Sequence, residues 1–296
     1  MRAKEIADFL HAELHGGDVE VEKTSTLDGI EAHTVIFAKK YSDSMAEKIN
    51  LGPSDVLAIV VPEYEGKIRC SYVISNNPRL SFIRIVTEFF TDRPAPVISP
   101  SAYVSPEAKI GVGVSIGSGC VIEGDVTIGD GTILYPNVTI TGKVKIGCRC
   151  VIKSGAVIGQ SGFGYERDEE GVPVAFPHTG GVRIGDNVSI GANTCIDRAT
   201  IGETIVEDNV KIDNLVHIAH NCIISTNTMI ASESNMCGGV VIGQQCWISP
   251  HSSVLQHTEI GNNSTIGMGA VVMKKRVAAN SVMFGNPAKT IGNNIN

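Results

Sequence analysis

The sequence has few aromatic residues, no long apolar run and no extended basic cluster. Aromatics make up 5% of the 296 residues, whereas glycine occurs 32 times, which favours narrow coils with tight corners over a bulky core. The net charge of −7 argues against a nucleic-acid footprint, which needs clustered cations. The longest apolar run, 56–61, is far shorter than the roughly 20 residues that span a bilayer. Residues 1–5 lead into no apolar segment, so we expect a cytoplasmic protein without a membrane span.

The cysteines also lack a recognisable pairing pattern, because no two of them form a CxxC motif. They are Cys70, Cys120, Cys148, Cys150, Cys195, Cys222, Cys237 and Cys246. Several fall between regularly spaced aliphatic residues, where a small side chain suits the corner of a coil. This usage favours free thiols in a reducing compartment over a disulfide framework.

What the sequence does contain is an aliphatic residue at every sixth position. The period runs through 98–158, returns over 184–196, and continues over 206–272 after a shift of four residues. A period of six fits neither an α-helix nor a simple strand and indicates a solenoid of hexapeptide repeats. At three hexapeptides a turn, the solenoid has roughly nine coils. We therefore predict a mainly β fold, a parallel β-helix.

The first 97 residues lack this period and predict a small α/β domain. Ala3–Leu14 places its apolar residues on one helical face, and 34–38 and 56–61 resemble strands. A second amphipathic helix is expected to begin at Asn77-Pro78. We assign 1–97 to this domain, for which the family resemblance described below implies nucleotide binding.

Two interruptions and an irregular end divide the remainder of the chain. We assign 98–275 to the β-helix and expect residues 160–182 to loop out of it, because 26 residues separate Ile158 from Ile184. A long loop on a rigid scaffold is a candidate binding element. A smaller insertion of four residues lies near 199–204, and 276–296 form a C-terminal tail.

The segment 211–221 is the richest in chemistry because it contains two histidines. Its inward aliphatic positions leave His217 facing outward and place His220 near a corner. An imidazole titrates near neutrality, which suits removal of a proton from an amine or hydroxyl. The alternative is a pair of surface histidines that fill corners. A zinc site, as in hexapeptide enzymes that hydrate carbon dioxide, would need a third ligand such as His251 or His257. Because these residues lie more than 30 positions further along the chain and do not obviously converge with the pair on one face, we predict no metal.

Three runs in this region resemble UDP-3-O-acylglucosamine N-acyltransferases, the enzymes of lipid A synthesis. They are Ile190–Arg198, Ile212-Asp213-Asn214 and Ile218-Ala219-His220-Asn221. Parts of the looped-out segment and of the N-terminal domain resemble the same family, so the similarity covers roughly residues 1–270. The resemblance implies a left-handed β-helix and a homotrimer with active sites at subunit interfaces. It also implies a nucleotide-linked amino sugar as acyl acceptor and a thioester as acyl donor.

The resemblance assigns catalytic roles to two residues. His220 would be the general base that deprotonates the sugar amine, and Asn214 would position the substrate, while backbone N–H groups at a corner stabilise the oxyanion. Phe37 and Tyr41 would stack on the nucleotide base, although they lie closer together than the family's pair. The expected substrate-binding residues are Phe37, Tyr41, Phe163, Tyr165, Asp197, Asp213 and His217. We expect Asp197 and Arg198 either to pair with each other or to orient the loop.

The end of the chain instead resembles coenzyme-A-dependent hexapeptide acetyltransferases. The resemblance is carried by Gly267–Val272 and Gly285-Asn286-Pro287-Ala288-Lys289. It implies that pantetheine follows this run and that lysines meet the coenzyme A phosphates. The expected donor-binding residues are His257, Gly269, Ala270, Lys274, Lys275 and Lys289. The alternative is a plain end cap for the solenoid.

Together these features predict an N-acyltransferase acting on a dTDP- or UDP-linked amino sugar of a surface polysaccharide. The favoured donor is acyl-CoA with a short or hydroxylated acyl chain, and no bound cofactor is expected. One alternative is the lipid A enzyme itself, UDP-3-O-(3-hydroxyacyl)glucosamine N-acyltransferase, which uses acyl carrier protein. Another is a non-catalytic β-helix whose N-terminal domain binds nucleotide.

Overall fold

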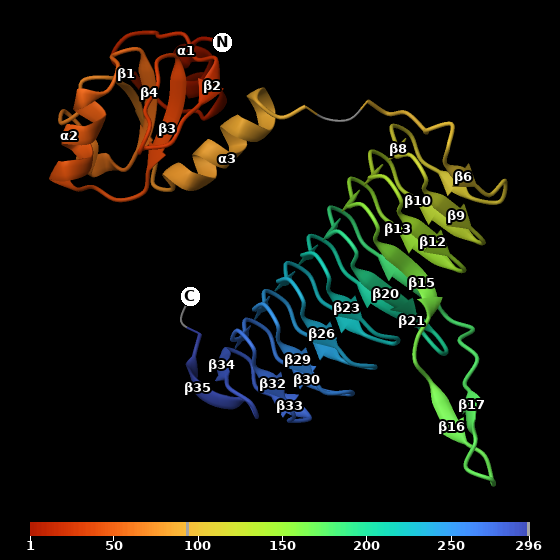
Figure 1. Ribbon diagram of the computed structural model, residues 1–296. Helices are drawn as coiled ribbons and strands as arrows, with labels where there is room; N and C mark the ends of the chain where they lie inside the picture. Colours follow the sequence, from red (N-terminus) through yellow and green to blue (C-terminus); the bar gives the residue numbers. More distant parts are fainter. Residues whose placement is uncertain (93–94, 295–296) are drawn as a thin grey trace. The chain divides into compact units, whose positions relative to one another are not determined.

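The computed structural model describes residues 1–92 and 95–294, and these two ranges form two compact units (Figure 1). No helix in the described part of the chain has both the length and the apolar content needed to cross a membrane.

The first unit is a five-stranded sheet with helices on both faces. Its strands, in the order β1-β5-β4-β3-β2, are β1 (Leu14–His15), β5 (Ser71–Ile74), β4 (Val56–Val60), β3 (Thr34–Ala38) and β2 (Lys23–Thr24). The helices are α1 (Ala3–Phe9), α2 (Asp43–Leu51) and α3 (Pro78–Phe89), with a 3₁₀ turn at Pro62–Tyr64. β4 is buried throughout, as expected of a parallel strand covered on both sides. The predicted small α/β domain is confirmed.

The residues that begin and end these helices explain their bounds. Ser42 accepts a hydrogen bond from the Met45 N–H at 3.2 Å, and Asn77 accepts one from Leu80 at 3.1 Å, so both act as N-caps. The predicted helix over 3–14 is shorter than expected. His11 adopts a φ of 53°, which a helix cannot continue through, and Leu14 then belongs to β1.

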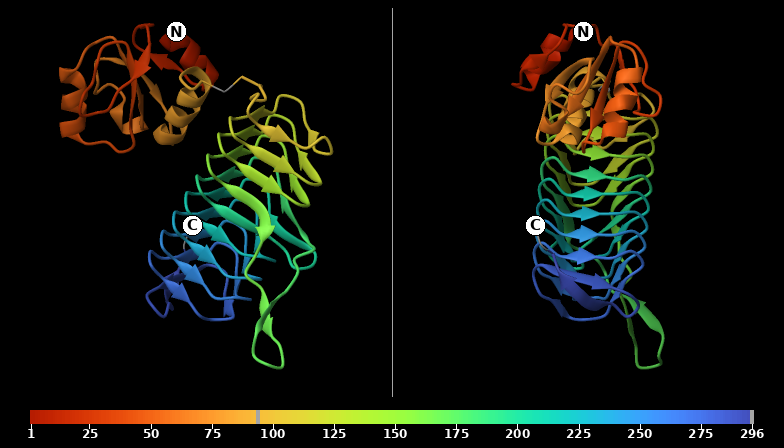
Figure 2. Two further views of the ribbon diagram at one scale, coloured as in Figure 1. Left: turned by 45° about the vertical axis from the view of Figure 1, so that its right-hand side comes forward. Right: turned by 90° about the vertical axis from the view of Figure 1, so that its left-hand side faces the viewer.

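The second unit is the predicted left-handed parallel β-helix, and this fold class is confirmed (Figures 1 and 2). Each coil contributes one strand to each of three parallel sheets, here called faces I, II and III. Ile212 pairs with Ile230 eighteen residues on, so a regular coil spends three hexapeptides.

Face I contains β6 (Tyr103–Val104), β9 (Val121–Glu123), β12 (Thr139–Thr141), β15 (Val157–Ser161), β20 (Cys195–Arg198), β23 (His217–Ile218), β26 (Asn235–Met236), β29 (Ser253–Val254) and β32 (Val271–Val272). Face II contains β7 (Lys109–Ile110), β10 (Val126–Ile128), β13 (Val144–Ile146), β18 (Gly181–Ile184), β21 (Glu203–Val206), β24 (Ile223–Ile224), β27 (Val241–Ile242), β30 (Glu259–Ile260) and β33 (Arg276–Val277). Face III contains β8 (Ser115–Ile116), β11 (Ile133–Leu134), β14 (Val151–Ile152), β19 (Ser189–Ile190), β22 (Lys211–Ile212), β25 (Met229–Ile230), β28 (Trp247–Ile248), β31 (Thr265–Ile266), β34 (Ser281–Phe284) and the antiparallel β35 (Lys289–Asn293).

The aliphatic positions of the six-residue period stack into one continuous core. Ile116, Ile158, Ile218 and Val272 are all buried, and each fully buried Ile or Val stabilises the fold by about 1.5–3 kcal/mol. The first coil is the exception, because Ile98 remains 47% exposed at the open end of the column and Val104 and Ile110 are only partly buried.

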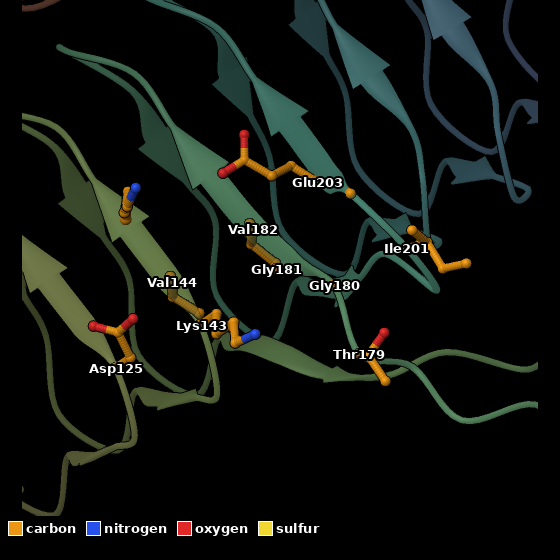
Figure 3. A pocket seen from close by; sticks show the side chains of 11 residues that line it. Asp125, Lys143, Val144, Thr179, Gly180, Gly181, Val182, Ile201 and Glu203 are labelled. Carbon is orange, nitrogen blue, oxygen red and sulfur yellow. The ribbon is translucent and has the colours of Figure 1, made fainter.

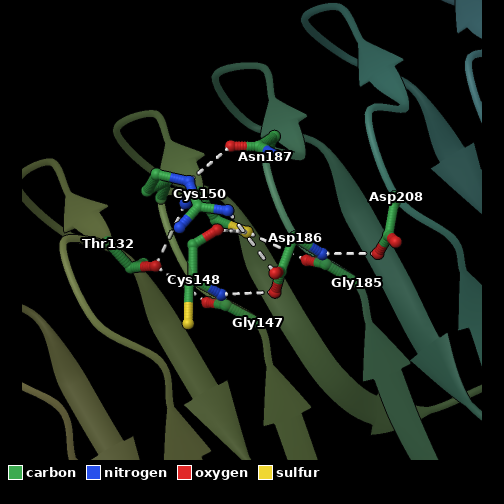
Figure 4. A network of polar contacts seen from close by, with 9 residues as sticks. Thr132, Gly147, Cys148, Cys150, Gly185, Asp186, Asn187 and Asp208 are labelled. Carbon is green, nitrogen blue, oxygen red and sulfur yellow. Dashed lines mark hydrogen bonds and ion pairs between the residues drawn. The ribbon is translucent and has the colours of Figure 1, made fainter.

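Corners between the faces are held by side chains that cap the backbone of the preceding coil (Figure 4). At the corner between faces II and III, Asp208 accepts from the Asp186 N–H at 2.7 Å. Asp186 in turn accepts from the Cys148 N–H at 2.8 Å, and Asn187 accepts from the Arg149 guanidinium at 2.9 Å. Such corners turn at residues with positive φ, commonly Asn, which tolerates this conformation.

Both interruptions of the period occur at the corner between faces I and II, in consecutive coils. The larger one contains an antiparallel hairpin of β16 (Tyr165–Arg167) and β17 (Pro173–Ala175), which projects away from the solenoid (Figures 1 and 2). The smaller one separates β20 from β21. The next coil places His220 at this same corner, so the insertions are neighbours of the candidate base.

The C-terminal segment continues the solenoid and then closes it. β33 and β34 pair in parallel with β30 and β31, and β35 folds back antiparallel on β34. The Phe284 ring covers Gly267, where a Cβ would lie 2.4 Å from the ring. The run that resembles coenzyme-A enzymes therefore packs as an end cap.

All eight cysteines are free thiols, and most are buried. Burial raises the pKa of the Cys70 thiol to about 11 and that of Cys222 to about 12. These side chains pack as small apolar groups.

Candidate active site

His220 lies at the corner that follows β23. Ile218 and Ala219 before it are buried, and Asn221 after it turns the chain with a φ of 60°. The imidazole is therefore directed by a fixed backbone and stays partly accessible.

Asn221 fixes the tautomer of His220. The Asn221 amide nitrogen donates to the Ile201 carbonyl at 2.9 Å, and its Oδ1 accepts from the Thr200 N–H at 3.1 Å. The amide orientation is thereby settled, and Oδ1 is the atom that lies 3.0 Å from His220 Nδ1. Nδ1–H must donate to it, so the neutral ring carries its lone pair on Nε2. This is the arrangement that a general base requires.

Two glycines leave space beside the ring. A Cβ on Gly238 would lie 2.8 Å from His220 Nε2, and one on Gly162 would lie 3.0 Å from His220 Cδ2. Gly238 occupies the same corner one coil later, and Gly162 belongs to the looped-out segment. A side chain at Gly238 would therefore crowd Nε2 itself, and one at Gly162 would crowd the Cδ2 edge of the ring.

Asp197 supplies a carboxylate next to this space. It is buried at the end of β20, and its Oδ2 lies 3.6 Å from His217 Nε2. Burial raises the pKa of Asp197, while His217, His220 and His178 nearby act to lower it. When ionised, this carboxylate stabilises an imidazolium formed on His220. Arg198 donates to Ser161 Oγ at 2.7 Å, so it orients the loop instead of pairing with Asp197.

His178 joins the cluster although the sequence interpretation did not select it. It lies between β17 and β18, is 8% exposed, and its ring is 5.3 Å from that of His220. Gly238 was also missed. Its spacing of 18 residues from His220, one coil, is a signal that could have identified it.

Asn214 and Asp213, in contrast, lie at the corner between faces III and I, one strand before His220. Asn214 Oδ1 accepts from the Ala192 N–H at 2.7 Å, and Asp213 Oδ1 accepts from the Asn214 N–H at 2.8 Å. Within one chain both side chains support the backbone of the corner. Phe163 and Tyr165 lie together in the looped-out segment with ring centroids 4.9 Å apart, and Phe163 is 87% exposed.

The expected donor-binding residues separate into two groups. In the three coils that follow His220, the corner between faces I and II contains first Gly239, then His257, and then Lys274 and Lys275. Both lysines are exposed. A Cβ on Gly239 would lie 2.4 Å from His257 Nδ1, so the His257 ring covers Gly239. With about 4.8 Å between neighbouring strands, three coils place the lysines about 14 Å from His220.

The other group does not reach this corner. Gly269 and Ala270 lie between faces III and I, and Ala270 is completely buried in the solenoid core. Its side chain faces inward, so any donor contact at Ala270 would be made by its backbone, and this contact stays a prediction. Lys289 is exposed on the end-capping strand β35.

The N-terminal unit has its own cavity of about 710 Å³, lined by Phe37, Phe82, Met45 and the ranges 24–27 and 38–40. The rings of Phe37 and Phe82 lie 4.7 Å apart.

Tyr41 does not face this cavity. Its ring packs 5.0 Å from that of Tyr64, beneath the Lys67 ammonium at 3.8 Å. Phe37 and Tyr41 thus do not bracket one space in this unit, because they belong to different clusters.

A smaller pocket of about 330 Å³ lies where the looped-out segment rejoins the solenoid (Figure 3). Its walls include Asp125, Lys143, Gly181 and Glu203, and none of the expected site residues. Among residues 1–92 and 95–294, no three His, Cys, Asp or Glu side chains are grouped as metal ligands.

Comparison with known proteins adds two kinds of likeness. The family model "Bacterial transferase hexapeptide (six repeats)" matches 107–142, 125–160 and 239–274, and "Hexapeptide repeat of succinyl-transferase" matches 181–214. The crystal structure of a UDP-N-acetylglucosamine acyltransferase from Bacteroides fragilis 9343 has a TM-score of 0.61 and 30% identity, over 67% of this chain and 75% of that one.

Two curated relatives carry the same name. The UDP-3-O-acylglucosamine N-acyltransferase of Herminiimonas arsenicoxydans is 33% identical over 301 residues, 92% of this chain and 84% of that protein. That of Janthinobacterium sp. (strain Marseille) is 44% identical over 150 residues, 51% of this chain and 43% of that protein.

Proposed function

The chain belongs to the UDP-3-O-acylglucosamine N-acyltransferase family, and we propose that it acylates the amine of UDP-3-O-acylglucosamine. Its relatives are N-acyltransferases, so the chain is an acyltransferase and the alternative of a non-catalytic β-helix is wrong. Similarity over 92% of the chain favours this acceptor over the other amino sugars considered from the sequence.

The observation that carries the proposal is the fixed tautomer of His220. Its Nε2 accepts a proton from the amine as the amine nitrogen attacks the carbonyl carbon of a thioester. The carbon–sulfur bond of the tetrahedral intermediate then breaks, and the leaving thiolate takes the proton from the imidazolium. Asp197 stabilises the imidazolium between these steps. The proposed oxyanion donor is a backbone N–H at this corner, where Gly238 places no side chain over the backbone.

The nucleotide is proposed to use the cavity of the N-terminal unit. Phe37 and Phe82 present aromatic surface there, which suits stacking on a base. Tyr41 lies outside this cavity, so the proposed base contact is Phe37 with Phe82.

The proposed donor is an acyl group on acyl carrier protein. The expectation of acyl-CoA depended on the C-terminal run, and that run packs as an end cap. The phosphopantetheine arm would follow the corner from Lys274 and Lys275 past His257 to His220. We further propose a homotrimer, in which Asn214 of one copy acts with His220 of another.

A panel of donors and acceptors tests this function. The protein is mixed with UDP-3-O-acylglucosamine or other nucleotide amino sugars, and with 3-hydroxyacyl carrier protein or acyl-CoA, and thiol release is followed. The proposal expects turnover with acyl carrier protein and UDP-3-O-acylglucosamine. Turnover with acyl-CoA but not with acyl carrier protein would overturn the proposed donor. Absence of turnover in every combination would overturn the proposed function. His251→Ala is the matched control for histidine variants, because His251 lies at a different corner and pairs with Glu233.

A further inference from the structure

The second imidazole of the cluster, His178, is held on two sides. The neck of the hairpin is closed by the Phe176 N–H, which donates to the Gly164 carbonyl at 2.8 Å. Beyond His178, the Thr179 N–H donates to the Thr200 carbonyl at 2.9 Å. The ring therefore sits in a rigid segment although it comes from an insertion.

One nitrogen of His178 is satisfied and the other is not. Nδ1 lies 2.8 Å from the Phe176 carbonyl oxygen, which can only accept, so Nδ1–H donates. In the neutral ring Nε2 then carries a lone pair. Nε2 is buried and has no hydrogen-bond partner in the described part of the chain. Buried polar atoms are rarely left in this state, so a ligand donor is the expected partner.

The unsatisfied nitrogen faces the space beside the candidate base. The position that a Cβ of Gly162 would take lies 3.3 Å from His178 Nε2, 3.0 Å from His220 Cδ2 and 3.0 Å from Asp197 Oδ2. Gly164 leaves room for the ring itself, since a Cβ there would lie 3.0 Å from His178 Cε1. Three polar side chains thus surround the position that a side chain on Gly162 would take, and glycine leaves that position without a side chain.

We infer that His178 is a positioning residue whose Nε2 accepts a hydrogen bond from the acceptor amine, an inference that rests on the proposed function. A neutral amine has two N–H bonds and one lone pair. With one N–H on His178 and the other on His220, each at about 3 Å, the lone pair points in one fixed direction. Ring centroids 5.3 Å apart are compatible with a nitrogen bound to both. Only the proton on His220 is transferred.

Two substitutions separate this role from support of the loop. His178→Phe keeps the ring but removes the acceptor, and we expect kcat with UDP-3-O-acylglucosamine to fall about 10- to 100-fold with the KM of the acyl donor unchanged. His178→Gln restores an acceptor and should stay within about threefold of wild type. Wild-type kinetics in His178→Phe would overturn the inference, as would equal loss in both variants with a raised donor KM.

A direct measurement covers the case in which a variant fails to fold. In the intact protein labelled with ¹⁵N-histidine, the Nε2 resonance of His178 should shift when UDP-3-O-acylglucosamine is added. An analogue with hydrogen in place of the amine should produce no such shift. An unchanged His178 signal with a bound, turned-over substrate would contradict the inference. Absence of turnover in the wild type would instead refute the proposed function beneath it.

Discussion

His220 Nδ1 lies 3.0 Å from Asn221 Oδ1, and the Asn221 amide is itself oriented by Thr200 and Ile201. Because the insertion after β20 provides both of these backbone groups, the four extra residues determine which nitrogen of His220 is basic. The insertion that interrupts the repeat therefore sets the tautomer of His220 in the next coil.

Asn221→Gly removes this support while keeping a residue that accepts positive φ. We expect kcat to fall about 10- to 100-fold, because the ring loses both its orientation and its preferred tautomer. Asn227→Gly is the control, since Asn227 has a φ of 63° at another corner. The measurement is the steady-state kcat of each variant, and equal kcat values would contradict the role given to Asn221.

Gly238→Ala should block the base. The new Cβ would lie 2.7 Å from His220 Cε1 and must displace the ring. We expect about a 100-fold loss of kcat, the scale associated with misplacing a reacting group by about 1 Å. Gly292→Ala is the comparison, because nothing lies within 4 Å of its Cβ position. A fully active Gly238→Ala enzyme would show that Nε2 is approached from elsewhere.

Asp197→Asn removes a buried ionisable carboxyl group and should change how the Tm depends on pH. The pKa of Asp197 is raised above its ordinary 3.8 by burial, so the folded state holds the proton more tightly than the unfolded state. Stability of the wild type then falls as pH rises through the folded-state pKa. The variant avoids this loss, so its Tm should exceed that of wild type at neutral pH, and the gap should close in acid.

The same variant should lose activity, by about tenfold, because no carboxylate faces the imidazolium. Thermal unfolding across pH, with Glu169→Gln on the exposed hairpin turn as control, tests the first part. A Tm difference that widens on acidification would show that the sign is wrong.

The fold was accessible from sequence because the six-residue period has a single structural meaning, and the inward position of Ile218 already directed His217 outward. His178 was not accessible, since it lies 42 residues before His220 and meets it only through a hairpin neck closed by Phe176 and Gly164. The packing of Phe37 and Tyr41 in different ring clusters was inaccessible for a similar reason. Phe37 faces α3 and contacts Phe82, whereas Tyr41 follows the strand and packs on Tyr64.

The most direct test of the account is acyl transfer to UDP-3-O-acylglucosamine by His220→Ala beside His251→Ala. The account predicts that His220→Ala loses at least about 100-fold in kcat, the scale of general-base catalysis, while His251→Ala matches wild type. Full activity in His220→Ala would contradict the central claim.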